Sequence, residues 1–228
     1  FVLLNNTQNE YFTLEEYKNH IENLQKDKDN KLVYIYATNQ EEQFGYVDAA
    51  KGKGYDVLLM DGVLDAHFVN SLEQKLSDST FVRVDSNTIE KLIVKDEAAM
   101  VSKLSEDETN AVKALFEKVV DSKQFDIQMD PMGEQDAPLV ITQNEFMRRM
   151  KEMNALGGGG GMMGFGELPD HYSLVVNVNH PLIAGLTGRD EESQTTAIKH
   201  LYDLARLSKN LLKGKELNDF IVRSQNSL

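Results

Sequence analysis

The first part of the chain alternates between short apolar runs and longer amphipathic stretches. Thr13–Glu16 has the capping-box pattern that begins a helix, and we expect this helix to run to about Leu24. Leu32–Ala37 is apolar at every position, which is typical of a strand buried on both faces. Helices and strands then alternate over Glu41–Lys51, Val57–Met60, Asp65–Leu76 and Phe81–Val84. The alternation predicts a small α/β subdomain with a parallel sheet, which ends near Val94.

The second part has a different order of elements. Ser105–Glu108 is another capping box, and it predicts a helix that ends near Val120. Phe125–Met129 and Leu139–Thr142 have strand patterns, and the turn residues at Pro131–Gly133 between them predict that the two strands pair with each other.

A helix at Asn144–Met153, five consecutive glycines at 157–161 and a strand at Tyr172–Val178 follow in the second part. Five glycines in a row do not hold one backbone conformation unaided, so we expect a mobile loop there. The order of elements predicts an α+β domain that closes with a helical hairpin. We therefore expect two domains, residues 1–95 and residues 96–228.

The end of the chain contains two amphipathic helices, Gln194–Leu212 and Glu216–Gln225, with Gly214 between them as the expected left-handed cap. Such a hairpin has two apolar stripes, and the rest of its domain covers only part of them. We expect a second copy to cover the remainder in a two-fold, four-helix contact, the alternative being that the hairpin packs onto its own sheet. The candidate interface residues are Leu201, Leu204, Leu211, Leu217, Phe220 and Ile221.

Charge and composition exclude several classes of partner. The 228 residues include 37 Asp and Glu against 24 Lys and Arg, a formal net charge of −13, so nucleic acid and anionic membranes are not expected partners. No apolar run approaches the roughly 20 residues that a membrane span needs. The absence of cysteine fits a reducing compartment, and we expect a cytoplasmic protein. Because the chain begins with Phe1, we also expect it to be a piece of something longer.

Two patterns suggest phosphate or metal chemistry. Gly52–Gly54 lacks the spacing of a phosphate loop and follows a helix, so a helix C-cap is the better interpretation. Asp61 and Asp65 follow a predicted parallel strand, where two carboxylates can hold Mg²⁺ for phosphoryl transfer. A Mg²⁺-dependent phosphotransferase is therefore the alternative function, although Asp65 also suits a helix N-cap. The five histidines have no paired ligand spacing, so no zinc site is expected.

A cluster of methionines and phenylalanines lies around the glycine run. Flexible thioethers suit a surface that accepts many apolar partners, but the same residues also suit an ordinary core. The adjacent glycines favour an exposed, adaptable surface. The residues concerned are Phe146, Met147, Met150, Met153, Met162, Met163 and Phe165.

Three segments together resemble the heat shock protein 90 family. Gly54–Met60, continued by Asp61 and Asp65–Leu72, resembles the end of that family's middle domain. Phe146–Lys151 resembles the Met-rich amphipathic helix of its C-terminal domain. Asn177–Leu182 is similar to the family's Asn-Pro-x-His-Pro strand end, with valine in place of the first proline. The order and spacing of the three segments agree over nearly the whole chain.

The resemblance implies an ATP-driven, dimeric chaperone whose nucleotide domain, and most of whose middle domain, lie outside this chain. It follows that we expect no catalytic residue, metal site or cofactor here, since ATP and Mg²⁺ would bind only to the intact protein. The expected partners are a second copy and unfolded or partly folded client proteins.

The resemblance also implies where clients bind, namely on the Met-rich helix and on the helix that carries His67 and Phe68. The family often has an acidic residue and tryptophan where Ala66 and His67 stand, so this second contact is expected to differ. The chain ends at Leu228 without the acidic pentapeptide of eukaryotic relatives, and if this C-terminus is the native one we expect no helical-repeat co-chaperones.

Overall fold

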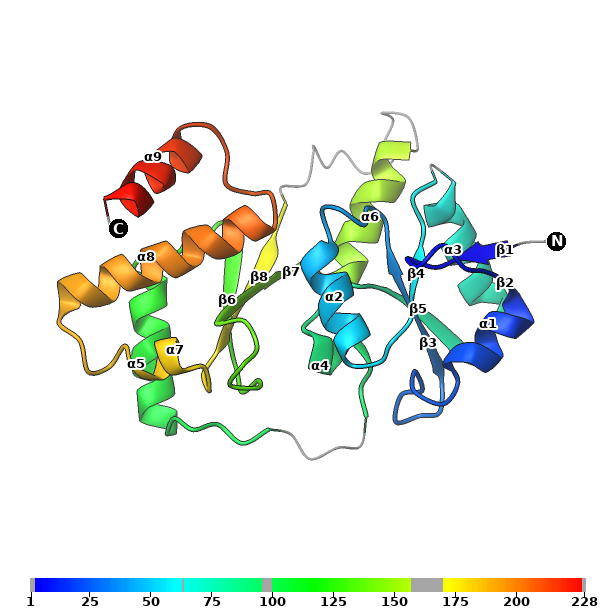
Figure 1. The fold of residues 1–228 in the computed structure, drawn as a ribbon, viewed down its shortest axis with the longest axis horizontal. Helices are drawn as coiled ribbons and strands as arrows, with labels where there is room; N and C mark the ends of the chain where they lie inside the picture. The colour runs from blue at the N-terminus through cyan, green and yellow to red at the C-terminus, as the bar shows by residue number, and fades with distance from the viewer. Residues whose placement is uncertain (1–2, 63, 96–99, 157–169, 227–228) are drawn as a thin grey trace. The chain divides into compact units, whose positions relative to one another are not determined.

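The computed structural model describes residues 3–62, 64–95, 100–156 and 170–226. These residues form two compact units (Figure 1). The first unit contains residues 3–95 together with 143–156, and the second contains residues 100–142 and 170–226. The division into domains 1–95 and 96–228 stays a prediction, and the structure adds that the helix after residue 143 packs with the first unit. Among the described residues, every helix is too short or too polar to span a bilayer.

The first unit is an α/β structure built around a three-stranded parallel sheet of order β4-β3-β5. A two-stranded antiparallel hairpin, β1-β2, precedes this sheet and was not predicted. In chain order the elements are β1 (Leu3–Asn5), β2 (Tyr11–Thr13), α1 (Leu14–Ile21), β3 (Leu32–Ala37), α2 (Phe44–Gly52), β4 (Val57–Leu59), α3 (Asp65–Lys75), β5 (Ser79–Arg83), α4 (Ile89–Leu92) and α6 (Glu145–Leu156).

The central strand β3 is buried at all six positions, as its continuous apolar run predicts. Leu32, Tyr34 and Tyr36 contribute to a core that also contains residues of α1 and α3. The alternate residues of β3 contribute to a second core, with residues of α2 and α4. Successive side chains of a strand point to opposite faces, so β3 requires helices on both sides of the sheet.

The predicted capping boxes are confirmed at Thr13 and at Ser105, where each hydroxyl accepts from a backbone N–H and the third helical residue, a glutamate, accepts in return. Helix α2 begins at Phe44, three residues later than expected. The reason is local, because the Gln43 side chain accepts hydrogen bonds from the backbone N–H groups of Thr38 and Asn39 and holds a turn there.

The second unit contains a three-stranded sheet of order β6-β8-β7, with β8 parallel to β6 and antiparallel to β7. The predicted direct pairing of the first two strands is therefore wrong. The central strand is the last of the three in the sequence, and it is the one buried at five of its six positions. The elements of this unit are α5 (Glu106–Glu117), β6 (Phe125–Asp130), β7 (Leu139–Thr142), β8 (Tyr172–Asn177), α7 (Pro181–Ala184), α8 (Glu191–Ser208) and α9 (Gly214–Gln225).

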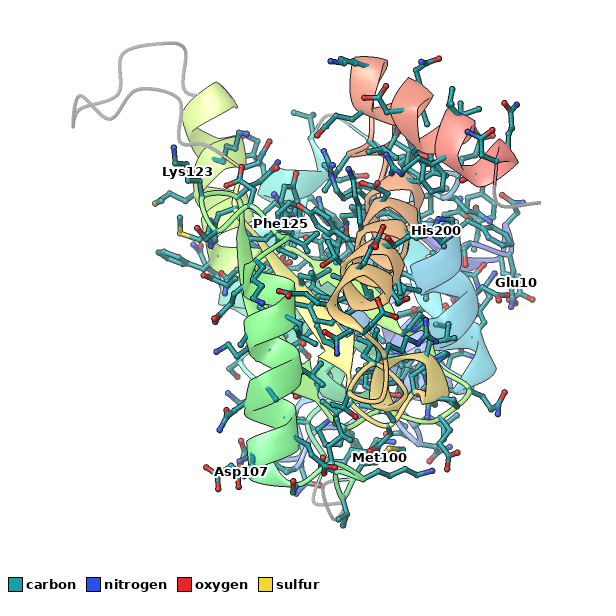
Figure 2. The ribbon with its side chains drawn as sticks, turned by 90° about the vertical axis from the view of Figure 1, so that its left-hand side faces the viewer. Glu10, Met100, Asp107, Lys123, Phe125 and His200 are labelled. Atoms are coloured by element: carbon teal, nitrogen blue, oxygen red, sulfur yellow. The ribbon has the colours of Figure 1, made fainter. Side chains whose placement is uncertain are left out.

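Helices α5 and α8 contribute with the sheet to the core of the second unit. Phe125, labelled in Figure 2, belongs to this core, and its ring centroid lies 5.7 Å from that of Tyr172 and 5.4 Å from that of Tyr202. The contact with Tyr202 is edge-to-face, a geometry that aromatic quadrupoles favour. The aromatic residues thus join the first strand of the sheet to the long helix α8.

Two buried asparagines organise the loops at the end of β8. Asn177 accepts from the backbone N–H of Met132 and donates to the Gly133 carbonyl. Asn179 donates to the carbonyls of Val101 and Met132. The motif that Asn177 begins therefore has a structural role in this unit. The side-chain amides of Asn177 and Asn179 satisfy backbone groups of the loops at residues 101 and 132–133, which lack secondary structure.

The two terminal helices form a hairpin whose turn differs from the predicted one. Asn210, with φ of +60°, ends α8, because its N–H donates to the Leu207 carbonyl and the next N–H, of Leu211, donates to Arg206. These two bonds are a Schellman motif. Gly214 also has a positive φ, +56°, but it begins α9 instead of capping α8.

Ion pairs fasten α9 to α8. Arg206 of α8 donates to Glu216 over 2.5 Å, and Asp203 of α8, which is buried, accepts from Arg223 of α9. The ring of Phe220 lies 5.4 Å from that of His200. The hairpin is consequently held by two ion pairs and one aromatic contact.

We expect Asn177→Ala to destabilise the second unit. The substitution leaves the buried N–H of Met132 without its partner and removes one of the two bonds to the Gly133 carbonyl, so the free energy of unfolding should fall by roughly 1–3 kcal/mol. Urea denaturation followed by circular dichroism measures the change. Asn226→Ala, at an exposed position of the same unit, is the control and should leave the midpoint unchanged. Equal midpoints for all three proteins would contradict the structural role of Asn177.

We expect the carboxyl group of Glu216 to titrate below its ordinary value of 4.5, because its hydrogen bond with Arg206 lowers the pKa of Glu216. A carboxyl whose folded pKa is depressed contributes stability at higher pH and loses it as pH falls through that pKa. Docking of α9 should therefore weaken in acid. NMR titration of the side-chain carbon tests this, and Arg206→Gln should move the midpoint back toward 4.5. An unchanged midpoint in that variant would show that the pair does not act on Glu216.

Candidate functional sites

Helix α6 has its charged side inward and its apolar side outward. Phe146 is 71% exposed and Met147 is 41% exposed, whereas Arg148 is only 5% exposed. A surface helix ordinarily buries its apolar stripe and turns its charges to water. The reversed arrangement leaves an unusual apolar surface on the first unit.

The inward side of α6 is held by a hydrogen-bonded network around Tyr36 of β3. Tyr36 donates its hydroxyl hydrogen to Glu145 over 3.0 Å and accepts from Arg148 over 2.6 Å. Arg148 also donates to Glu145 over 2.6 Å. Burial, together with the charge of Glu145, raises the pKa of Tyr36 well above its usual range, so the hydroxyl keeps its proton as a donor.

Arg149 joins α6 to two other elements of the same unit. Its guanidinium donates to Glu73 of α3 over 2.5 Å and to the Phe81 carbonyl of β5 over 2.7 Å. A third bond runs to Glu145 over 2.6 Å. Burial opposes the charge of Arg149, but the bonds to Glu73 and Glu145 outweigh it and raise the pKa of Arg149. A bidentate guanidinium suits this position because it is planar and remains charged.

The structure places the predicted client-binding residues with different exposure. On α3, His67 is exposed and Phe68 is partly buried against the core of the first unit. On α6, Phe146 and Met147 are exposed and Met150 is half-buried. Helices α3 and α6 therefore carry exposed residues on one unit, joined by the bond between Arg149 and Glu73. The side chain of Met153, and residues Met162, Met163 and Phe165, lie outside the described part of the chain.

The candidate phosphate and metal residues have ordinary structural contacts. Gly52 ends α2, and Gly54 has φ of +79°, which confirms the helix C-terminus predicted there. Asp65 lies in the first turn of α3 and accepts the backbone N–H of Gly62 over 2.8 Å. Asp61 is exposed. Among the described residues, no three His, Asp or Glu side chains come together as potential metal ligands.

The predicted interface residues fall into three classes of exposure. Leu201 and Phe220 are buried within the chain itself, and Leu211 and Leu217 are half-buried. Leu204 and Ile221 are exposed to 43% and 44%. Exposed apolar residues that the sequence analysis did not select accompany them on the same two helices, namely Leu207 and Val222.

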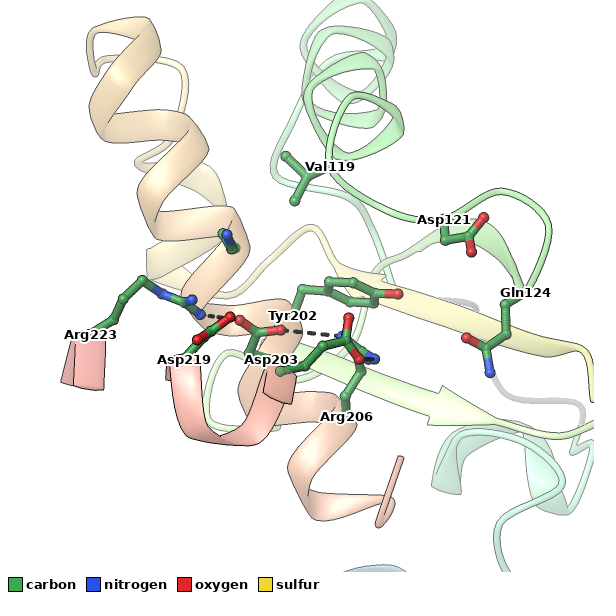
Figure 3. Close-up of a pocket in the computed structure, with 10 residues that line it drawn as sticks. Val119, Asp121, Gln124, Tyr202, Asp203, Arg206, Asp219 and Arg223 are labelled. Atoms are coloured by element: carbon green, nitrogen blue, oxygen red, sulfur yellow. Dashed lines mark hydrogen bonds and ion pairs between the residues drawn. The ribbon is translucent and has the colours of Figure 1, made fainter. Parts of the chain in front are cut away.

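A polar pocket of about 480 Å³ lies beside the hairpin, between α8, α9 and the segment that follows α5 (Figure 3). Two ion pairs lie among its charged groups, Asp203 with Arg223 and Arg206 with Glu216. Burial raises the pKa of the neighbouring Tyr202 to about 12. The pocket is lined by four acidic and three basic side chains, and the two ion pairs connect α9 to α8.

The charged residues that hold α6 on the first unit were not among the predicted site residues. Glu145, Arg148 and Arg149 are spaced i, i+3 and i+4, which places them on one face of α6 opposite to Phe146 and Met147. This spacing indicates one charged face on the helix. It does not indicate that the face is buried, because a charged face is more often solvated.

Comparison with known proteins gives consistent matches over nearly the whole chain. The family described as "Hsp90 protein" matches residues 3–224. The chaperone protein htpG of Bacteroides fragilis strain YCH46 is 44% identical over 202 residues, which cover 87% of this chain and 29% of the relative. The chaperone protein HtpG of Porphyromonas gingivalis strain ATCC 33277 is 43% identical over 204 residues, 88% of this chain and 29% of the relative.

The HtpG protein of Bacteroides thetaiotaomicron aligns with 98% of this chain at 34% identity, and the aligned part is 42% of that protein. The chain thus spans well under half the length of the curated relatives it matches. The family match covers the strand end at Asn177, the helix α6 and the α3 region, which are the three segments whose order carried the resemblance. The chain belongs to the Hsp90 family.

Proposed function

We propose that this chain is the client-binding and self-association part of an ATP-dependent chaperone of the HtpG kind. The observation that carries the proposal is the outward apolar side of α6, where Phe146 is 71% exposed. Membership of the Hsp90 family and the chaperone names of the relatives support the same function. In this proposal ATP and Mg²⁺ bind to the intact protein, at a domain that lies outside this chain.

Clients are proposed to bind on α6 and on the neighbouring helix α3. An unfolded chain offers apolar side chains in no fixed arrangement, and the flexible thioether of Met147 adapts to many of them. Phe146 adds a large, rigid apolar area, which the exposed ring makes available without a conformational change. Burial of such side chains by a client is the favourable term that drives binding.

Self-association is proposed to use the outward residues of the terminal hairpin. Leu204 and Leu207 lie three residues apart on α8, and Ile221 and Val222 are adjacent on α9. A two-fold contact presents the same patch twice, so four helices would cover these residues. Leu201 and Phe220 are then proposed to support the interface from inside the chain, because each is already buried.

The client proposal predicts that Phe146→Ser with Met147→Ser loses most binding to unfolded protein. Each apolar side chain contributes roughly 1.5–3 kcal/mol when fully buried, so affinity should fall at least about tenfold. Suppression of aggregation of a heat-denatured enzyme measures the loss. Phe44→Ser is the matched control, because Phe44 is 63% exposed on α2 of the same unit. Full activity of the double variant would contradict a role for α6.

The association proposal predicts that Leu204→Asp with Ile221→Asp gives folded monomers. Both side chains are exposed in the single chain, so the fold should survive while two copies of each charge face each other in a dimer. Sedimentation velocity at low micromolar concentration measures the state. Val101→Asp, at an 85% exposed position of the same unit, is the control. A double variant that sediments as a dimer would place the interface elsewhere.

A further inference from the structure

Among the described residues, no strand pairs with the outer edge of β5. Leu32 donates to the Asp78 carbonyl and Val84 donates to the Tyr36 carbonyl, so even-numbered residues of this region face β3. Residues 79, 81 and 83 consequently direct their N–H and C=O groups away from the sheet. An open edge of this kind is a liability, because it can pair with another chain.

Charged side chains take the place of a neighbouring strand along this edge. Phe81 donates its N–H to Glu73 over 2.9 Å and accepts from Arg149 through its carbonyl over 2.7 Å. The N–H of Arg83 points at Glu145 over 3.4 Å. Three backbone groups of β5 are therefore capped by one residue of α3 and two residues of α6.

Arg149 is the residue that connects these caps. It contacts Glu73 and Asn70 on α3, Phe81 on β5 and Glu145 on its own helix, while its side chain is 19% exposed. A partly buried guanidinium with two carboxylate partners and a carbonyl has little freedom to rotate. The helix that carries it is fixed in rotation as well as in position.

The polar edge decides which side of α6 turns inward. If α6 turned by half a turn, Phe146 and Met147 would lie against the N–H and C=O groups of β5 and leave them unsatisfied. The buried charges of α6 would then lose their partners. Only the observed orientation satisfies both sets of groups, and it is the orientation that leaves the apolar side free.

We propose that Arg149 is a positioning residue for client binding, which holds α6 on β5 and α3 so that clients meet Phe146 and Met147 on a docked helix. The inference rests on the proposed client-binding function of α6. Arg149 itself touches no client in this arrangement, because its guanidinium faces the sheet edge. Its effect on clients passes through the orientation of the helix.

The bonds of Arg149 to Glu73, Phe81 and Glu145, here called the clamp, could instead serve only to protect the edge of β5 from pairing, with no effect on client binding. The two possibilities differ in what happens when the helix is released. A protective clamp predicts that a freed α6 binds clients as well as a docked one, or better. A positioning clamp predicts weaker binding, since a loose helix must be ordered again before its apolar residues act together.

The test uses the whole 228-residue chain with Arg149→Gln, Arg149→Lys and Glu73→Gln. Arg189→Gln is the matched control, because Arg189 is exposed in the second unit. Client affinity is measured by fluorescence anisotropy with labelled, reduced and carboxymethylated α-lactalbumin, which stays unfolded. Docking of α6 is measured separately by NMR hydrogen exchange at the amide of Arg83, which points at Glu145 of α6, and at the amide of Phe81, whose acceptor Glu73 is bound by Arg149. Circular dichroism confirms that each variant is folded.

We expect Arg149→Gln to speed exchange at both amides and to weaken client affinity by about tenfold, and Arg149→Lys to fall between it and the parent. Glu73→Gln should weaken binding in the same direction. The double variant with Arg149→Gln should lose less than the sum of the two, because the pair acts as one unit. In a Phe146→Ser, Met147→Ser background, Arg149→Gln should change affinity no further.

Three results would overturn the inference. Unchanged exchange at Phe81 and Arg83 in Arg149→Gln would show that this residue does not hold the helix. Faster exchange with undiminished client affinity would show that docking does not matter. A further loss of affinity caused by Arg149→Gln in the Phe146→Ser, Met147→Ser background would show that Arg149 contacts the client directly. If that background alone leaves affinity unchanged, the proposed function of α6 fails first, and the two failures remain distinguishable.

Discussion

Arg149 reaches from α6 to the carboxylate of Glu73 and to the carbonyl of Phe81, and the arrangement of the first unit's free surface depends on that reach. Without it the Phe81 carbonyl would lose this donor, and α6 would keep only the bonds of Glu145 and Arg148 to β3 and β5. Isolated exposed ion pairs contribute little to stability. Here the pair of Arg149 and Glu73 is partly buried, and Arg149 also satisfies the Phe81 carbonyl. Removal of Arg149 therefore leaves the Glu73 carboxylate without its cationic partner.

Much of the fold could be predicted from local patterns. The capping boxes at Thr13 and Ser105 and the continuous apolar run of β3 each depend on residues close together in the sequence, and each was confirmed. The strand pairing of the second unit failed for a physical reason. The central strand β8 enters the sheet only after the chain has passed through α6, and such a long-range insertion leaves no mark in the segment between β6 and β7.

The orientation of α6 shows a second limit of sequence analysis. Periodicity predicts that Phe146 and Met147 share one face and that Glu145, Arg148 and Arg149 share the other. It does not indicate which face is inward, because that depends on what the neighbouring surface offers. The edge of β5 has N–H and C=O groups that need hydrogen-bond partners, and Arg149 and Glu145 of α6 provide them. The exposure of the apolar face, left open by the sequence, follows from the edge.

In the terminal hairpin, as in α6, charged side chains make contacts within the chain while some apolar side chains remain exposed. Asp203 and Arg206 of α8 bind Arg223 and Glu216 of α9, so charges provide the contact within the chain. Leu201 and Phe220 are buried within the chain, whereas other apolar residues of the two helices remain exposed, namely Leu204, Leu207, Ile221 and Val222. Charge pairs are specific in geometry and compatible with a wet pocket, whereas apolar area is what association with another chain requires. In the proposed dimer the ion pairs would hold α9 to α8, and the four exposed apolar residues would supply the area that a second copy covers.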